Sequence, residues 1–135
     1  MIKNNELMIG DWVHSTIHNI NTTVSEIEGG GVWLKNLKCW ERHFEHELDP
    51  VPITPEILEK NGFVIKKKWA QKGNFGDNPL IMWHYYDDIF TGDFKHELEI
   101  HQNDTGKVHV RVQCNYVHEL QHAMKLCGIK FEIEI

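Results

Sequence analysis

The segment YVHELQHAMKLC, residues 116–127, determines how the end of this chain folds, and Gly128 follows it directly. Its apolar residues recur at steps of three and four, which is the period of a helix with one buried stripe. These residues are Val117, Leu120, Ala123, Met124 and Cys127. Asn115 stands at the position of an N-cap and Gly128 at that of a left-handed stop. We therefore predict a helix over residues 116–127, with its apolar stripe turned toward the core.

The same segment contains His118, Glu119 and His122, which spell the H-E-x-x-H signature of zinc peptidases. Two histidines four residues apart project from one side of a helix, so both can bind one Zn²⁺ while the Glu acts as general base on the metal-bound water. With about 100° per residue, the two histidines fall opposite Leu120 and Met124. We therefore expect both imidazoles to face water or a second layer, and not the core.

A catalytic zinc site also needs a third protein ligand, and the sequence offers none at a recognisable spacing. Lys125 and Gly128 stand where the extended H-E-x-x-H-x-x-G-x-x-H motif has Gly and His. With 10 histidines in 135 residues, so short a motif also arises by chance. We therefore expect neither metal nor cofactor, and keep a zinc-dependent hydrolase with ligands His118 and His122 and base Glu119 as the alternative function.

The composition of 41% hydrophobic and 25% charged residues is that of an ordinary globular protein. A formal net charge of −6 disfavours broad attachment to nucleic acid, which needs a basic face. No apolar run approaches the roughly 18 to 20 residues of a membrane helix, and the N-terminus lacks the apolar core of a signal peptide. Cys39, Cys114 and Cys127 are widely spaced, which suits free thiols in a reducing compartment. We expect a cytoplasmic protein.

Residues 8–40 combine β-favouring residues with turn glycines and predict a small antiparallel unit. The run Gly29–Gly31 should make a tight connection between two of its strands. We expect three or four short strands curled into an SH3-like half-barrel, within an N-terminal β lobe of residues 1–53. The segment 39–48 is uninformative, although its His43, Glu45 and His46 are metal ligands in principle.

The remaining residues, 54–135, predict a C-terminal α+β lobe. Thr54 as N-cap and Pro55 at the first position indicate a short connector helix that stops at Gly62. The run Leu80–Tyr86 is the most apolar short stretch and should be a central strand. Helix 116–127 would cover the sheet, and the alternating residues 129–135 would return to it as a last strand. The predicted fold class is α+β.

Residues 94–102 and 106–113 alternate in polarity and predict a hairpin. We place Ile100 opposite Val108, so that one face of the hairpin is nearly all apolar. The other face then carries opposite charges across the strands. The predicted pairs on that face are Glu99 with His109 and Glu97 with Arg111.

Three stretches of the chain resemble small uncharacterised proteins that are common in the genomes, mobile elements and phages of gut anaerobes. The stretches are LMIGDWV (7–13), ITPEILEKNGF (53–63) and YVHELQHAMKLCGI (116–129). The last is the most specific, because the family pattern Y-V-H-x-L-Q is matched here by Tyr116, Val117, His118, Leu120 and Gln121. The pattern requires neither Glu119 nor His122. The resemblance therefore implies a shared fold and a phage-like genomic setting, but no zinc site and no activity.

The chain has five tryptophans, more than one core of this size normally uses. Aromatic residues are enriched where protein surfaces bind. We therefore favour a non-enzymatic accessory or interaction module that binds a protein partner, with Trp12, Trp33 and Trp40 as candidate binding residues. A third hypothesis is an SH3-like nucleic-acid binder with Lys66–Lys68 on the phosphates, which the net charge disfavours.

Overall fold

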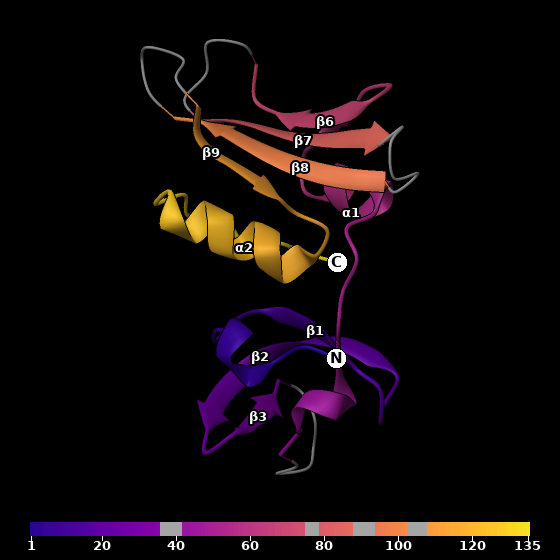
Figure 1. Ribbon diagram of the computed structural model, residues 1–135, viewed down its shortest axis with the longest axis vertical. Coiled ribbons are helices and arrows are strands. Elements are labelled where there is room, and N and C mark those ends of the chain that lie inside the picture. Colours follow the sequence, from indigo (N-terminus) through magenta and orange to yellow (C-terminus); the bar gives the residue numbers. More distant parts are fainter. Residues whose placement is uncertain (36–41, 75–78, 88–93, 103–107) are drawn as a thin grey trace. The chain divides into compact units, whose positions relative to one another are not determined.

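The computed structural model describes residues 1–35, 42–74, 79–87, 94–102 and 108–135, and it confirms the predicted α+β class (Figure 1). A four-stranded and a five-stranded antiparallel sheet make up most of its regular structure. The chain divides into two compact units, residues 1–52 with 116–118, and residues 53–115 with 119–135. Within the described ranges, no helix has both the length and the apolar character needed to cross a membrane.

The N-terminal unit is built on the four-stranded sheet, with strand order β3-β2-β1-β4. Its strands are β1 (Trp12–Ser15), β2 (Ile20–Glu28), β3 (Gly31–Leu34) and β4 (Leu48–Pro50). Two short 3₁₀ helices accompany them, η1 (Asn4–Glu6) and η2 (Glu45–Glu47). The turn from β2 to β3 uses Gly29 and Gly30 at φ values of 55° and 80°. Glycine adopts such values more readily than other residues, and the predicted tight connection is confirmed.

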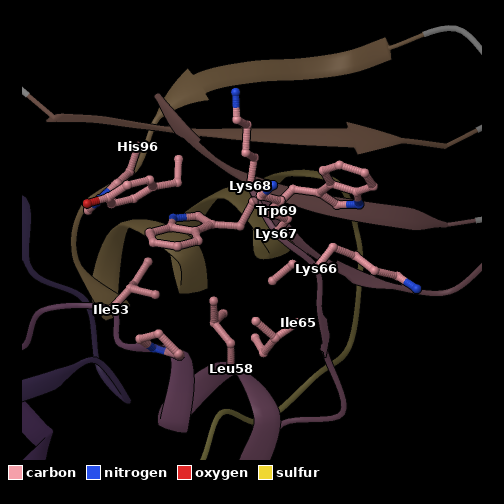
Figure 2. Close-up of a pocket in the computed structure, with 12 residues that line it drawn as sticks. Ile53, Leu58, Ile65, Lys66, Lys67, Lys68, Trp69 and His96 are labelled. Atoms are coloured by element: carbon pink, nitrogen blue, oxygen red, sulfur yellow. The ribbon is translucent and has the colours of Figure 1, made fainter. Parts of the chain in front are cut away.

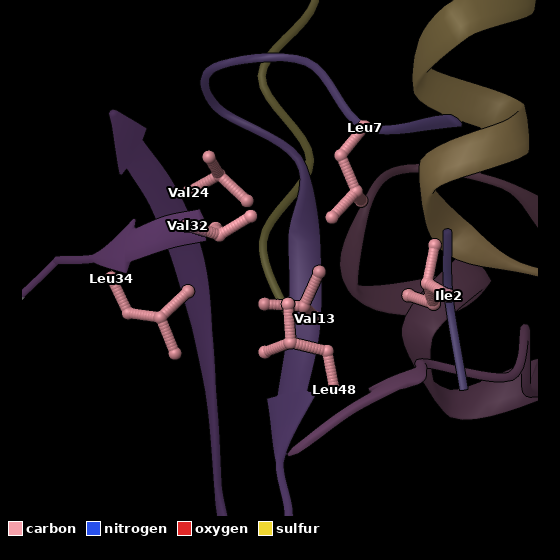
Figure 3. Close-up of a cluster of buried hydrophobic side chains, with 7 residues drawn as sticks. All are labelled: Ile2, Leu7, Val13, Val24, Val32, Leu34 and Leu48. Atoms are coloured by element: carbon pink, nitrogen blue, oxygen red, sulfur yellow. The ribbon is translucent and has the colours of Figure 1, made fainter. Parts of the chain in front are cut away.

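Alternation along these strands gives the N-terminal unit one buried apolar face (Figure 3). The core residues are Ile2, Leu7, Val13, Val24, Val32, Leu34 and Leu48. Burying each such side chain fully contributes about 1.5 to 3 kcal/mol. Trp12 and Trp33 precede and follow core residues, so they lie on the opposite face, where both are half-buried.

The segment that the sequence left unassigned is described from residue 42. The imidazole of His43 is fully buried, with Nε2 3.1 Å from the hydroxyl oxygen of buried Ser15. Glu45 accepts a hydrogen bond at 2.9 Å from the backbone N–H of Asn4. His46 is exposed. Among the described contacts, these three side chains therefore have separate surroundings and do not converge on one point.

The C-terminal unit contains the five-stranded sheet, with strand order β5-β6-β7-β8-β9. Its strands are β5 (Val64–Ile65), β6 (Trp69–Lys72), β7 (Leu80–Asp87), β8 (Phe94–His101) and β9 (Val108–Gln113). Strand β7 lies at the centre, as predicted. Helix α1 (Pro55–Lys60) follows the N-cap Thr54, whose hydroxyl accepts a hydrogen bond at 3.3 Å from the backbone N–H of Ile57. The predicted connector helix is confirmed.

Helix α2 (Val117–Leu126) lies along one face of the five-stranded sheet (Figure 1). Its predicted stripe is buried at Val117, Leu120, Ala123 and Met124. As predicted, Gly128 is the left-handed residue that stops the helix, with a φ of 71°. The next backbone N–H, of Ile129, donates to the carbonyl of Met124 at 2.9 Å, which closes the last turn.

The hairpin of β8 and β9 differs in register from our prediction. Ile100 pairs with Val110, two residues beyond Val108, and Glu99 pairs with Arg111. A shift of two residues keeps every side chain on the same face, because side chains alternate with a period of two. The polarity pattern therefore identifies the faces and cannot choose between these registers. An irregularity between Ile100 and His101 shifts the register by one residue near the turn.

Residues 129–135 are all described, and they do not form the predicted last strand. The backbone of Glu134 instead bonds to the side chain of Asn61, just after helix α1. Its N–H donates to Oδ1 at 2.8 Å, and its carbonyl accepts from Nδ2 at 2.6 Å. Asn61 also donates to the carbonyl of Ile57 at 2.7 Å. The buried amide of Asn61 thus provides hydrogen-bond partners for backbone groups of the tail that a neighbouring strand would otherwise provide.

We expect Asn61→Ala to free residues 129–135 and to lower the free energy of unfolding by about 1 to 3 kcal/mol, because the bonds of a buried amide are lost. Urea denaturation measures the stability, and limited proteolysis with mass spectrometry reports on the tail. Lys60→Ala is the control, since exposed Lys60 donates to the carbonyl of Ile135 at 3.1 Å and should change stability by less than about 0.5 kcal/mol. Equal effects of the two substitutions would contradict this role of Asn61.

Candidate functional site

The H-E-x-x-H residues lie at the start of α2, and each has different surroundings. His118 is only 6% exposed, and its imidazole stacks on the ring of Tyr116 with centroids 6.0 Å apart. Glu119 accepts a hydrogen bond at 3.0 Å from the backbone N–H of Asn115. His122 is half-buried. Of the two surroundings predicted for the imidazoles, water or a second layer, the burial of His118 excludes water for that ring.

The burial of His118 follows from how the first turn of α2 is held. Residues 116–118 belong to the same compact unit as residues 1–52. The backbone N–H of Val117 donates to the carbonyl of Val51 at 2.9 Å, and Tyr116 forms a β-bridge with Pro52. A helical wheel assumes one buried side along the whole helix. It cannot anticipate that the first turn has a packing partner of its own.

The structure gives Glu119 a capping role. Its carboxylate accepts a backbone N–H just before the helix and lies near the positive end of the helix dipole. Among the residues that the structure describes, no group of three or more His, Cys, Asp or Glu side chains is arranged to hold a metal ion. Glu119 thus caps the helix, whereas the zinc alternative requires it as a general base.

Two of the three cysteines are described, and both are free thiols. Cys114 is buried, and burial together with the nearby Glu119 carboxylate raises the pKa of its thiol. Burial also raises the pKa of half-buried Cys127. A thiol with a raised pKa remains protonated at neutral pH and is a poor nucleophile. Cys39 lies outside the described residues.

Among the residues that the structure describes, a cavity is lined by two tryptophans other than those chosen from the sequence. Trp12 and Trp33 lie on the face of the N-terminal sheet opposite its core, and Trp40 lies outside the described residues. In the C-terminal unit, Trp69 and Trp83 line a cavity of about 400 Å³. This volume is near the lower end of the roughly 300 to 1,000 Å³ range of ligand pockets.

Three parts of the C-terminal unit form this pocket, which lies between one face of the sheet, helix α1 and the β5–β6 hairpin (Figure 2). Its walls are mainly apolar and aromatic, whereas lysines border it. The lining residues are Ile53, Pro55 and Leu58 beside and in α1, Ile65–Trp69 on the hairpin, and Ala70, Trp83, Tyr85 and His96 on the sheet. The sequence signal for the sheet wall is that Trp83 and Tyr85 stand two residues apart, so that both side chains point to one face of a strand.

A cluster of three aromatic rings forms the sheet wall of the pocket. The imidazole of His96 lies 4.4 Å from the ring of Trp83 and 5.2 Å from the ring of Tyr85, between centroids. Burial lowers the pKa of His96, so its ring is neutral at pH 7. Both of its ring nitrogens are buried, and neither forms a hydrogen bond with any residue that the structure describes.

The pocket tryptophans, in contrast, use their polar atoms within the protein. The indole N–H of Trp83 donates to the carbonyl of Cys114 at 2.9 Å, and that of Trp69 donates to Gln71 at 3.0 Å. Buried polar groups without a partner are rare in folded proteins. His96 therefore brings unused hydrogen-bonding capacity to the pocket.

Lys66, Lys67 and Lys68 are exposed and occupy the turn of the β5–β6 hairpin. The backbone holds this turn in place. The N–H of Lys66 donates to the carbonyl of Trp69 at 2.7 Å, and the carbonyl of Lys68 accepts from the N–H of Tyr85 at 3.0 Å. Three positive charges thus border the pocket, in a chain whose net charge is −6.

The opposite face of the sheet carries a buried carboxylate, that of Glu99, which is 7% exposed. Arg111 donates to Oε1 through Nε at 3.0 Å and also through Nη2. The Nε2 atoms of His101 and His84 lie 3.3 and 3.5 Å from Oε2. Burial raises the pKa of Glu99, but the hydrogen bonds from Arg111 and His101 and the charges of His84 and Arg111 outweigh it. The pKa of Glu99 therefore lies below its ordinary value.

No family model, curated protein or solved structure matches this chain. The SH3-like description of the N-terminal unit and the phage-like setting therefore stay predictions. What the chain binds has to be inferred from the lining of the pocket.

We expect Glu119→Ala to lower the free energy of unfolding by about 1 kcal/mol, because the start of α2 loses an acceptor. Glu119→Gln should keep most of the stability, since its amide oxygen still accepts the N–H of Asn115. Urea denaturation measures both, with Glu132→Ala as an exposed-carboxylate control. An unchanged stability in Glu119→Ala would contradict the capping role.

We expect the stability of the protein to fall below about pH 5, partly because of Glu99. A carboxyl whose pKa is lowered on folding binds fewer protons in the folded state. Its stabilisation is therefore present above the unfolded-state pKa and is lost as the pH falls through the folded-state pKa. Urea denaturation at pH 7, 5 and 3 should show a smaller acid-induced loss in Glu99→Gln than in the wild type.

Glu97→Gln is the control for this measurement, because Glu97 also pairs with Arg111, at 2.9 Å, but is more exposed. It should keep most of the wild-type pH dependence. If the wild type and Glu99→Gln showed the same pH dependence, protonation of Glu99 would not contribute to the pH dependence of the free energy of unfolding.

Proposed function

We propose that this protein is a non-enzymatic interaction module for a protein partner, and that its C-terminal pocket receives an aromatic side chain from an acidic segment of that partner. The observation that carries the proposal is the combination in one pocket of aromatic walls and a lysine border. Neither part alone would suggest an acidic peptide with an aromatic anchor.

The walls of the pocket offer accessible apolar surface to a partner. Ile65 is 38% exposed and Tyr85 is 44% exposed, although both are large and line a concave site. Apolar surface that remains accessible inside a pocket is what a partner's anchor residue buries, and aromatic anchors supply much of the energy at protein interfaces. A cavity of about 400 Å³ suits one large side chain better than a whole peptide.

The lysines supply the charge complementarity. A net charge of −6 repels an acidic partner from most of the molecule, whereas Lys66, Lys67 and Lys68 gather positive charge at the pocket. Charges at the rim of an interface mainly steer encounter and select the partner, and their effect falls as salt rises. Binding to this pocket should therefore weaken with ionic strength.

The observations favour binding over the zinc alternative because the structure uses Glu119, the required general base, as a helix cap. Nucleic acid is disfavoured as the partner, since three adjacent lysines on a hairpin turn are a small basic area in an acidic chain. Single-stranded DNA therefore serves in the test as the competing ligand.

The test uses a fluorescein-labelled peptide with one tyrosine among aspartates and glutamates, and fluorescence anisotropy at low and moderate salt. We expect Ile65→Ala to weaken binding about tenfold, since it removes apolar contact area from the wall. Val64→Ala is the matched control: Val64 precedes Ile65 on β5 and is 55% exposed, but does not line the pocket. It should bind as the wild type does.

Replacing Lys66, Lys67 and Lys68 with alanine should weaken binding and flatten its salt dependence, whereas Lys125→Ala, an exposed lysine on α2, should do neither. No binding of the peptide by the wild type at low salt would overturn the proposal. Equal losses in Ile65→Ala and Val64→Ala would also overturn it. So would steeply salt-dependent retention of single-stranded DNA without binding of the peptide.

A further inference from the structure

We infer that His96 determines which aromatic side chain the pocket accepts, by hydrogen bonding to the polar atom of a tyrosine or tryptophan and so disfavouring phenylalanine. This inference rests on the proposed function, because it names the anchor residue that the same pocket receives. It assigns to His96 a specificity role and no part in chemistry.

The imidazole of His96 is neutral near pH 7 and has unused hydrogen-bonding atoms. Both ring nitrogens of His96 are buried and lack a hydrogen bond from the part of the chain that the structure describes. A neutral imidazole has one N–H donor and one acceptor nitrogen. The lowered pKa of His96, which is due to burial, keeps the ring in this neutral form near pH 7. The ring can therefore accept from an O–H or N–H of a ligand, once the side chains that cover its nitrogens move aside.

The second step is the position of the ring. His96 pairs with Tyr85 across β7 and β8, and its carbonyl accepts from the N–H of Cys114 at 2.9 Å. Its ring stacks on that of Tyr85 and meets that of Trp83 at a tilt of 48°. The imidazole is thus held by strands and by aromatic neighbours, and not by a loop. A group held this rigidly can discriminate between ligands that differ by one polar atom.

The third step is the chemistry of the ligand. Tyrosine and tryptophan combine an apolar ring, which suits the walls formed by Ile53, Leu58 and Ile65, with one polar atom that needs a partner when buried. Phenylalanine fills the same walls but leaves the imidazole desolvated and without a partner. Sites built around such a polar group reject the analogue that lacks it more strongly than apolar contacts alone could.

The experiment uses three fluorescein-labelled acidic peptides that differ only in a central tyrosine, tryptophan or phenylalanine. We expect the wild type to bind the tyrosine and tryptophan peptides at least about tenfold more tightly than the phenylalanine peptide. His96→Phe keeps an aromatic ring between Trp83 and Tyr85, and should bind all three peptides within about twofold of one another. His96→Gln keeps a donor and an acceptor, and should retain part of the preference.

A second measurement needs no substitution. In protein labelled with ¹⁵N-histidine, the tyrosine peptide should shift the ring nitrogens of one pocket histidine, and the phenylalanine peptide should not. Absence of discrimination by the wild type, or an undiminished preference in His96→Phe, would overturn the inference while leaving the proposed function intact. Failure of all three peptides to bind the wild type would overturn the proposed function, and this inference with it.

Discussion

The two-residue alternation of side chains along β7 and β8 is the constraint on which the C-terminal unit depends. It sends Trp83, Tyr85 and His96 to one face of the sheet, where they form the wall of the pocket. It sends His84 and Glu99 to the other face, where the carboxylate meets Arg111. A shift of one residue would exchange these groups, placing the charges in the pocket and the aromatic rings among the polar side chains.

The buried polar groups on the two faces of the sheet differ in their hydrogen bonding. Glu99 is desolvated, but hydrogen bonds from Arg111 and His101 more than compensate, so its carboxylate remains charged. His96 is desolvated without such compensation among the described residues. Folded proteins tolerate uncompensated polar groups mainly where a ligand, water or reaction uses them. Among the described residues of the pocket wall, His96 is therefore a buried polar side chain to which the fold gives no hydrogen bond.

Local periodicity was enough to predict most of the elements. The stripe of α2, its end at Gly128, the cap at Thr54 and the central strand β7 each depend on a few adjacent residues. The register of β9, the path of residues 129–135 and the burial of His118 depend on distant partners. In each of these cases a second arrangement fits the pattern equally well, so the sequence cannot choose between them.

The pocket was missed for a related reason. Its walls come from segments as distant in sequence as Ile53 and His96, and each segment looks ordinary by itself. Lys66–Lys68 form a basic run in the sequence, and Trp69 and Trp83 are two of its five tryptophans. Nothing in the sequence brought the lysines and these tryptophans together. Pairing Tyr85 with His96 across β7 and β8 is the step that assembles the site.

The H-E-x-x-H segment shows how burial decides what a motif can mean. Zinc chemistry needs two imidazoles and a carboxylate that reach one point, with a position left open for water. In this chain the carboxylate caps a helix and one imidazole stacks on Tyr116. The stretch Y-V-H-x-L-Q is then explained by packing: Tyr116 and Val117 bond to residues 51 and 52, while His118 and Leu120 are buried. Within the motif, His118 and Glu119 thus each have a structural role of their own.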